Sequence, residues 1–186
     1  DNFEWNLEYR MSTLELKELS HPSGEVIKIA AGKTLDLKSQ GTTTLPTGSV
    51  LQVVQATSEV GIITTTTNTW IDTDATATIT PTSASSKILI MQSTGGMVAA
   101  ANISFGFQLL RGSTPISTRI RHGYAGTTAW HPLPFAMEYL DSPNTTSEIT
   151  YKFQVRLSGT GQIRFNPNTG NANVDSGTVI LMEIQG

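Results

Sequence analysis

Turn-forming residues interrupt this 186-residue chain at short intervals, and this spacing limits what the chain can fold into. Clusters such as PTSASS, DSPNTTS and NPNTGNANVDSG separate short runs in which apolar and polar residues alternate. Alternation with a period of two is typical of half-buried β-strands, and no long window has the period of an amphipathic helix. Gly, Pro, Asn and Ser in the clusters favour turns. The sequence therefore predicts an all-β protein.

The longest alternating runs lie after residue 48, and they predict the main domain. Ten short strands in about 140 residues are typical of an antiparallel sandwich or barrel. Thr and Ser, which make up about a quarter of the chain, predict a hydroxyl-rich surface. The predicted strands cover residues 50–57, 61–67, 75–80, 87–94, 103–111, 115–120, 135–140, 148–158, 162–165 and 178–185.

The first eleven residues, DNFEWNLEYRM, form a separate amphipathic run. Their apolar side chains would lie on one face of a strand and their polar side chains on the other. Such an aromatic face needs a partner, and we predict that it pairs with a sister chain or with a larger particle by strand addition. The candidate anchor residues are Phe3, Trp5, Leu7 and Tyr9.

Three further short runs follow this opening strand, at 14–19, 25–30 and 34–38. They are too small to bury a core alone. GTTTLPTG, residues 41–48, reads as a linker because Gly and Pro interrupt strands. We therefore predict a β-rich N-terminal segment at 1–47 and an antiparallel sandwich domain at 48–186.

The overall composition argues against several classes of function. A net charge of −3 with only 15% charged residues does not suit a nucleic-acid-binding surface, which needs clustered basic residues. No apolar run is long enough to predict membrane insertion. Cysteine is absent, which excludes disulfides and Cys-based metal sites. We expect no cofactor and no metal.

The candidate catalytic groups do not form a recognised motif. His122 and His131 have no acidic residue between them, and a triad needs both a nucleophile and an acid besides the base. Glu138 and Asp141 are close in EYLD, and Glu148 follows a turn; we interpret all three as solvated strand-end carboxylates. A phosphate-binding loop is absent as well. The sequence therefore predicts that the protein is not an enzyme.

Two segments carry residue types that are typical of binding surfaces. Rigid aromatic side chains and Arg anchor interfaces and stack on sugar faces, although burial in the core or in a subunit contact is the alternative. Amide-rich loops bind glycans or Ca²⁺, although they also serve as tolerant turns. The candidate receptor or interface residues are Arg121, His122, Tyr124, Trp130 and His131 in the first segment, and Asn168, Asn171 and Asn173 in the second.

Several phrases, taken together and in order, resemble the C-terminal domain of tailed-bacteriophage fibre and appendage proteins, especially those of cyanobacterial and other aquatic phages. The leader MSTLELKELSHPSGEVIKIAAGKTLDL at 11–37 is similar to the N-terminal stretch of such proteins. Residues 1–10 lie outside the resemblance, which leaves open that Met11 is the natural start and that these ten residues are foreign. The other phrases are GSVLQVVQAT (48–57), TATITPTSASSKILIM (76–91), LLRGSTPI (109–116), YLDSPNTTSEITYKFQVRLSG (139–159) and TVILMEIQG (178–186).

The resemblance implies a virion structural protein, usually a homotrimer, with a jelly-roll-like sandwich at the end of a thin β-rich stalk. We therefore expect a phage tail fibre in the virion, assembled in the bacterial cytoplasm. Its N-terminal segment would contact other virion proteins, and its sandwich would face a host-surface glycan or protein. The alternatives are a capsid head fibre or decoration protein and a free lectin-like carbohydrate-binding module.

Overall fold

The computed structural model describes residues 31–33, 45–58, 62–65, 68–99, 101–126, 131–165 and 177–186. The chain divides into two compact units, residues 1–44 and residues 45–186. The second unit begins inside the predicted linker at 41–48. The predicted boundary between a stalk and a sandwich domain stays a prediction, because little of the first unit is described.

All described regular structure in the second unit is β-strand. Each of the ten predicted runs overlaps an observed strand, because turn residues end the runs where alternation stops. Several observed strands are longer than the predicted runs. They are β1 (Val50–Ser58), β2 (Ile62–Thr65), β3 (Ile71–Ile79), β4 (Lys87–Ala99), β5 (Ile103–Arg111), β6 (Thr114–Ala125), β7 (His131–Asp141), β8 (Ile149–Leu157), β9 (Gly161–Phe165) and β10 (Gly177–Ile184).

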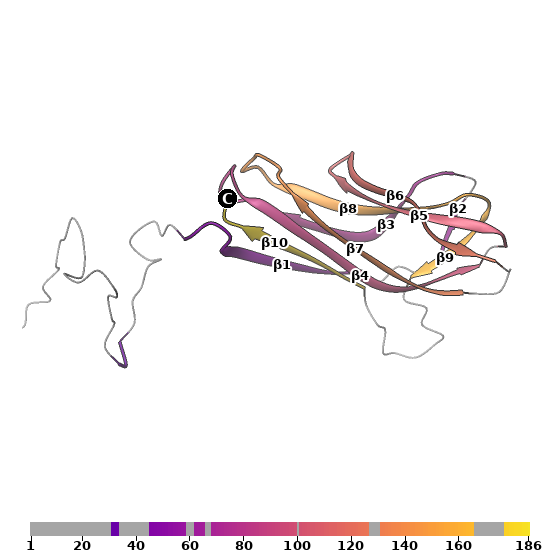
Figure 1. Ribbon diagram of the computed structural model, residues 1–186, viewed down its shortest axis with the longest axis horizontal. Coiled ribbons are helices and arrows are strands. Elements are labelled where there is room, and N and C mark those ends of the chain that lie inside the picture. Colours follow the sequence, from indigo (N-terminus) through magenta and orange to yellow (C-terminus); the bar gives the residue numbers. More distant parts are fainter. Residues whose placement is uncertain are drawn as a thin grey trace, which may run out of the picture. The chain divides into compact units, whose positions relative to one another are not determined.

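The strands form two antiparallel sheets that face each other (Figure 1). Sheet A contains β1, β10, β4, β9 and β2 in that order, and β7 pairs with the other edge of β4. Sheet B contains β3, β8, β5 and β6 in that order. In both sheets, strands that are distant in the sequence lie side by side, so the fold depends on long-range pairing.

Two strands of sheet A, β10 and β9, share one edge of the longer strand β4. β10 pairs with β4 between Lys87 and Ser93, and β9 pairs with the same edge of β4 between Gly96 and Ala99. β1 and β2 lie against β10 and β9 in the same way. If β1 with β2 and β9 with β10 are each counted as one interrupted strand, each sheet has four strands. This is an eight-stranded jelly roll, and the predicted all-β, jelly-roll-like sandwich is confirmed.

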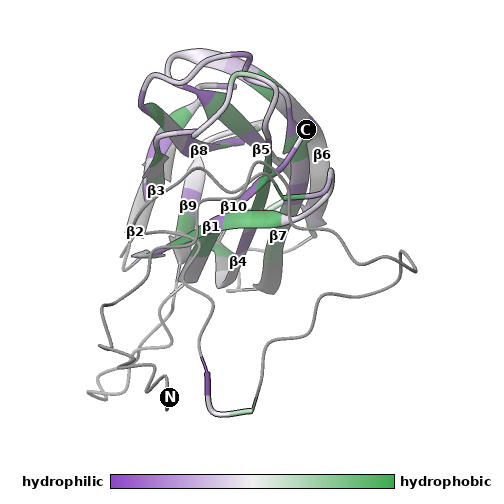
Figure 2. Ribbon diagram, turned by 90° about the vertical axis from the view of Figure 1, so that its left-hand side faces the viewer, coloured by the Kyte–Doolittle hydropathy of each residue, from purple (hydrophilic) through white to green (hydrophobic). Residues whose placement is uncertain are grey.

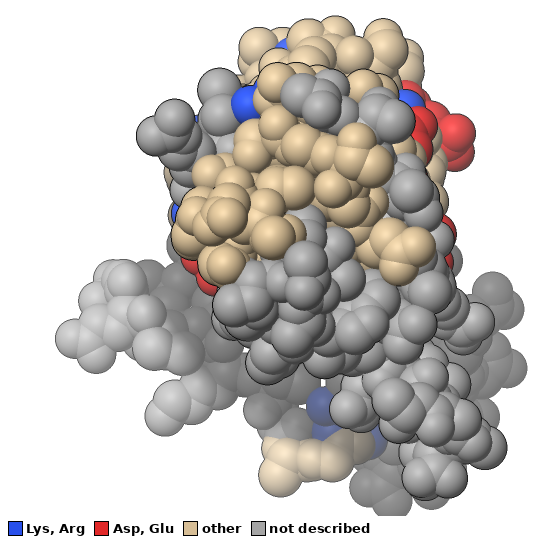
Figure 3. All heavy atoms as spheres, turned by 90° about the vertical axis from the view of Figure 1, so that its right-hand side faces the viewer, with Lys and Arg blue, Asp and Glu red and all other residues tan. Residues whose placement is uncertain are grey.

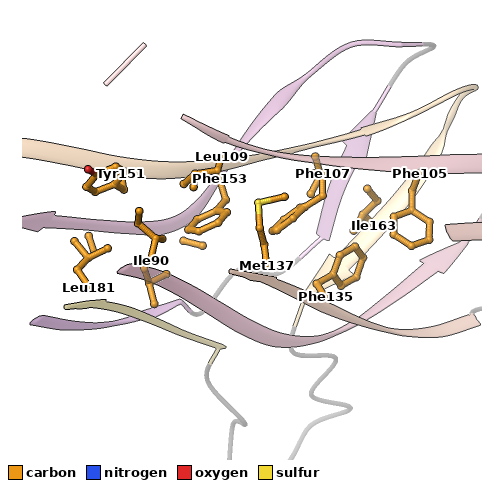
Figure 4. Packing of buried hydrophobic residues seen from close by; sticks show 14 of the residues in the cluster. Ile90, Phe105, Phe107, Leu109, Phe135, Met137, Tyr151, Phe153, Ile163 and Leu181 are labelled. Atoms are coloured by element: carbon orange, nitrogen blue, oxygen red, sulfur yellow. The ribbon is translucent and has the colours of Figure 1, made fainter. Parts of the chain in front are cut away.

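The core fills the space between the sheets (Figure 4). Inward-facing residues alternate with outward-facing ones, as the burial of every second residue in β8 and β10 shows. Phe107 stacks on Phe153 with ring centroids 5.4 Å apart, and Phe105 meets Phe135 edge to face at 5.2 Å. These aromatic residues come from both sheets, so the core joins the two layers.

The chain enters and leaves the sandwich at the same end, which we call the termini end (Figure 1). The Gly48 amide donates to the Gln185 carbonyl at 2.8 Å, and the Gln185 amide donates to the Ser49 carbonyl at 2.8 Å. The opposite end, which we call the far end, contains residues 68–70, 101–102 and 158–160. The two ends of the sandwich therefore contain different parts of the chain.

Candidate functional site

The far end contains the one candidate recognition side chain that the structure describes. Tyr124, near the end of β6, is 60% exposed, and its hydroxyl donates to Asn102 Oδ1 at 2.9 Å. Asn102 has a φ of 54°, a left-handed conformation that Asn tolerates better than most residues. The hydrogen bond orients the ring, so the Tyr124 side chain is both accessible and held in place.

A second aromatic side chain lies at the same end, and the sequence analysis missed it. The Arg156 guanidinium carbon sits 5.0 Å from the centre of the Trp70 ring, a cation–π arrangement. Trp70 directly precedes β3, and Arg156 faces outward from β8. The sequence did contain a signal for it, because Trp70 is a lone Trp beside a turn in TNTWID. The predicted binding segment was chosen for aromatic residues in the same kind of context.

Between these aromatic residues and the termini end, polar side chains cross the outer face of sheet B. Thr118 on β6 donates to Gln108 on β5 at 3.2 Å, and Gln108 donates to Gln154 on β8. Gln154 and Lys152 both donate to Asp72 on β3, the latter at 2.8 Å. Hydrogen bonds from Lys152 and then from Gln154 hold the pKa of Asp72 below its usual range. We call this set of five residues the polar ladder.

The described surface at the far end is mostly uncharged (Figure 3). Lys and Arg occur near the margin of that view and Asp and Glu at its sides, with uncharged residues over the described centre. Uncharged polar and aromatic surface suits contact with a neutral glycan or a protein better than contact with a polyanion. The chemistry available at this end is therefore binding through stacking and hydrogen bonds.

The other predicted recognition and anchor residues are not placed together by the structure. Arg121 and His122 lie in β6 and His131 begins β7, but their side chains are outside the described part. The remaining candidates lie wholly outside the described residues, so their predicted roles stay predictions. They are Trp130, Asn168, Asn171 and Asn173, and the proposed anchor residues Phe3, Trp5, Leu7 and Tyr9.

One sequence-based interpretation is wrong. Asp141 was expected to be a solvated carboxylate, but it is only 6% exposed. It accepts a hydrogen bond from the Tyr151 hydroxyl at 2.7 Å, and Arg111 donates to both of its oxygens at 3.1 and 3.2 Å. Burial, and then the hydrogen bond to Asp141, raises the pKa of Tyr151 far above its usual value. Glu138 is exposed, so the two carboxylates of EYLD have different environments.

A second buried carboxylate connects segments of the chain by hydrogen bonds at the termini end. Glu183 is fully buried, and it accepts hydrogen bonds from Gln52 at 2.6 Å and from the amide and hydroxyl of Thr82 at 2.7 and 2.8 Å. Burial acts to raise the pKa of Glu183, but interactions with Ser86, Gln52 and Thr82 outweigh it, so the pKa lies below its usual value. The carboxylate therefore links β1, β10 and the turn before β4.

Within the described residues, no three His, Cys, Asp or Glu side chains converge in a way that could hold a metal ion. The same part of the chain contains no helix of the length and apolar character needed to cross a bilayer.

The fold and these surfaces define a two-sheet jelly-roll domain with distinct ends. No family model and no curated protein matches the sequence. Among solved structures, infectious bursal disease virus Gx strain is similar at 12% identity and a TM-score of 0.42, over 81% of this chain and 42% of that one. The VP2 subviral particle of the same virus is similar at 14% identity and a TM-score of 0.35, over 83% and 42%. This chain thus spans less than half of those proteins.

Proposed function

We propose that this chain is a non-enzymatic structural protein of a virion appendage, a phage tail fibre that works as a homotrimer. The resemblance of residues 11–186 to phage fibre and appendage proteins supports this proposal. In this role the N-terminal segment contacts other virion proteins and the sandwich faces outward. The protein would assemble in the bacterial cytoplasm and remain part of the released particle.

The observation that carries the proposal is the separation of the two ends of the sandwich. The N-terminal segment joins at the termini end, where Gly48 and Gln185 are hydrogen-bonded. The exposed Tyr124 and the Trp70–Arg156 pair lie at the far end. An appendage that is attached at one end and meets a host surface at the other needs this separation. Three copies on one fibre would also make weak contacts effective through avidity.

The direct test is to locate the chain on phage particles. Gold-labelled antibodies against the purified full chain should decorate the distal part of tail fibres in electron micrographs. Decoration of the capsid would favour a head fibre or decoration protein, and no decoration of any particle would contradict a virion role.

The role of the opening strand is tested separately. Deletion of residues 1–10 should leave the sandwich folded, because ten strands of the second unit form without it, but it should reduce incorporation into particles. Unchanged incorporation would contradict an anchoring role for residues 1–10.

The exposed Tyr124 and the half-buried Trp70 at the far end also favour a second candidate, a free lectin-like module. This candidate predicts saturable sugar binding that Tyr124→Ala or Trp70→Ala weakens by about 2- to 13-fold, since aromatic stacking contributes about 0.5–1.5 kcal/mol. A glycan array that shows no binding by folded protein would remove this candidate.

A further inference from the structure

The outer face of sheet A is unusually apolar for a surface. Inward residues of its strands, such as Ile90 on β4 and Leu181 on β10, are fully buried in the core, so the alternate residues point outward. Strand register arranges the outward residues in four rows that start at the termini end. The rows are Val50–Ile184–Lys87, Val53–Met182–Leu89–Leu140, Gln55–Ile180–Met91–Glu138 and Thr57–Thr178–Ser93–Ala136.

Apolar residues concentrate in the first three rows, and several of them are open to solvent. Val50 is 51% exposed, Val53 is 56% exposed and Leu140 is 50% exposed. The apolar residues between them on β4 and β10 are half-buried by their neighbours. Figure 2 shows green along strands of this sheet, as expected where both inward and outward residues are apolar. Single exposed apolar residues are ordinary, but a contiguous group on one sheet face marks a contact surface.

The size of this face suits a small protein contact. Four strands spaced about 4.8 Å apart and four rows spaced about 6.6 Å apart cover roughly 500 Å². Three such faces would bury about 1,500 Å² in total, which is about 500 Å² for each pair of copies and makes the face a small interface by itself. Met, Ile, Leu and Val side chains are also typical of the cores of homo-oligomer interfaces.

The charge on the face favours a further copy of this chain as its partner. When a face meets itself, any net charge on it is repelled by the same charge on the copy. Among the outward residues of the four rows, Lys87 and Glu138 are the charged ones, and they have opposite sign. The face is therefore neutral, and a rotated copy can place Lys87 near Glu138.

The position of the apolar rows points to the same partner. They lie beside the start of β1, and Leu45, which leads into that strand, is 39% exposed. Copies that meet here would bring their N-terminal segments together. Those segments carry alternating runs that cannot bury their apolar sides alone but can do so among several copies.

We propose that the outer face of sheet A is the self-association surface of this protein, with the faces of three copies directed toward a shared axis. The inference rests on the homotrimer of the proposed function and identifies the surface that forms it. The far end and the polar ladder then remain free to face outward.

The test compares two charge-matched double variants of the full chain. Leu89→Glu with Met182→Glu places charge in the centre of the apolar face, and Thr78→Glu with Thr150→Glu places the same charge on the outer face of sheet B. The molar mass of each is measured by light scattering at micromolar concentration, and folding by circular dichroism. The wild type and the sheet B variant should be trimers. The sheet A variant should be a folded monomer, with its dissociation concentration raised at least about 100-fold, because like charges would face each other in the interface.

The outcomes separate the inference from the function on which it rests. A monomeric wild type, or a sheet A variant that stays as associated as the wild type, overturns the inference. A wild-type dimer that the sheet A variant dissociates supports the surface but contradicts the homotrimeric fibre. If the double variant does not fold, Val53→Lys decides, because this residue is 56% exposed on an edge strand and can change without disturbing the core. It should raise the dissociation concentration about 10-fold or more, and an unchanged value overturns the inference.

Discussion

The two outer faces of the sandwich differ although their strands share one core. On sheet B, the outward residues of β8 are Thr150, Lys152, Gln154 and Arg156, and most join the polar ladder or the Trp70 contact. On sheet A, the outward residues of β4 and β10 are mostly Ile, Leu and Met. Sheet B satisfies its outer groups within the chain, whereas sheet A leaves apolar surface that water does not solvate well.

This difference shows that the residue types at inward-facing and at outward-facing strand positions have separate causes. ITYKFQVRL in β8 alternates strictly, which suits a sheet with one face in solvent. KILIM in β4 and VILM in β10 are nearly continuous apolar runs, which are typical of strands covered on both faces. The residues of the inner face are required for folding, and the residue types of the outer face indicate whether that face contacts water or another protein.

The largest expected effect comes from the core that both faces share. Phe153→Ala removes a fully buried ring that stacks on Phe107, and the free energy of unfolding should fall by about 3–5 kcal/mol. Denaturant titration followed by circular dichroism measures this change. If the loss were below about 1 kcal/mol, the two sheets would not depend on a common core.

A smaller effect should distinguish two tyrosines. Tyr151→Phe removes the hydroxyl that donates to buried Asp141, so the carboxylate loses a partner, and unfolding should become about 1–3 kcal/mol easier. Tyr124→Phe is the matched control, because its hydroxyl bonds Asn102 at the exposed surface, and it should cost less than about 0.5 kcal/mol. Equal effects in denaturant titration would contradict the buried network.

Acid should lower the free energy of unfolding through Glu183, which lies on β10 of sheet A. Its pKa is lowered on folding from an ordinary value of 4.5, so its stabilisation is full well above that pH and is lost as the pH falls through 4.5 and below. Glu183→Gln should therefore reduce the slope of unfolding free energy against pH below about 4.5. The measurement is denaturant titration at several pH values and one fixed protein concentration. Glu138→Gln is the matched control, since it removes the same charge from the exposed face, and an unaltered slope in Glu183→Gln would contradict the assignment.

The smallest effect concerns the exposed ion pair of the polar ladder. Lys152→Met removes the donor that lowers the pKa of Asp72, so that pKa should rise toward its usual value in an NMR titration. Stability should change by less than about 1 kcal/mol, because Asp72 is exposed and screened. Added salt should weaken this pair while leaving the molar mass of the proposed trimer unchanged, because apolar burial is not screened. Dissociation of the assembly by moderate salt would contradict an apolar interface.

The strand positions could be predicted because alternation and turn residues act locally. KFQ in β8 and SVLQVV at the start of β1 show their pattern without any knowledge of partners. The pairing of β4 with β7 on one edge and with both β9 and β10 on the other could not be predicted, because it depends on contacts between distant residues.

The candidate site was only partly accessible to sequence reasoning. Tyr124 was singled out by residue type, and it proved to be exposed. Asp141 and Glu183 were not recognised as buried, because their partners Tyr151, Arg111 and Gln52 lie elsewhere in the chain. The apolar outer face had a signal in the continuous run VILM, but its width required the register of four strands.

The interruption between β9 and β10 has a consequence for how such a domain can vary. Phe165 pairs with Gly96 and Thr178 pairs with Ser93, so only Thr94 and Gly95 of β4 separate the two pairings, although residues 166–176 lie between β9 and β10 in the sequence. The register is fixed independently on each side of this gap. An insertion between β9 and β10 should therefore leave both pairings with β4 in register, so we expect this connection to tolerate a displayed peptide.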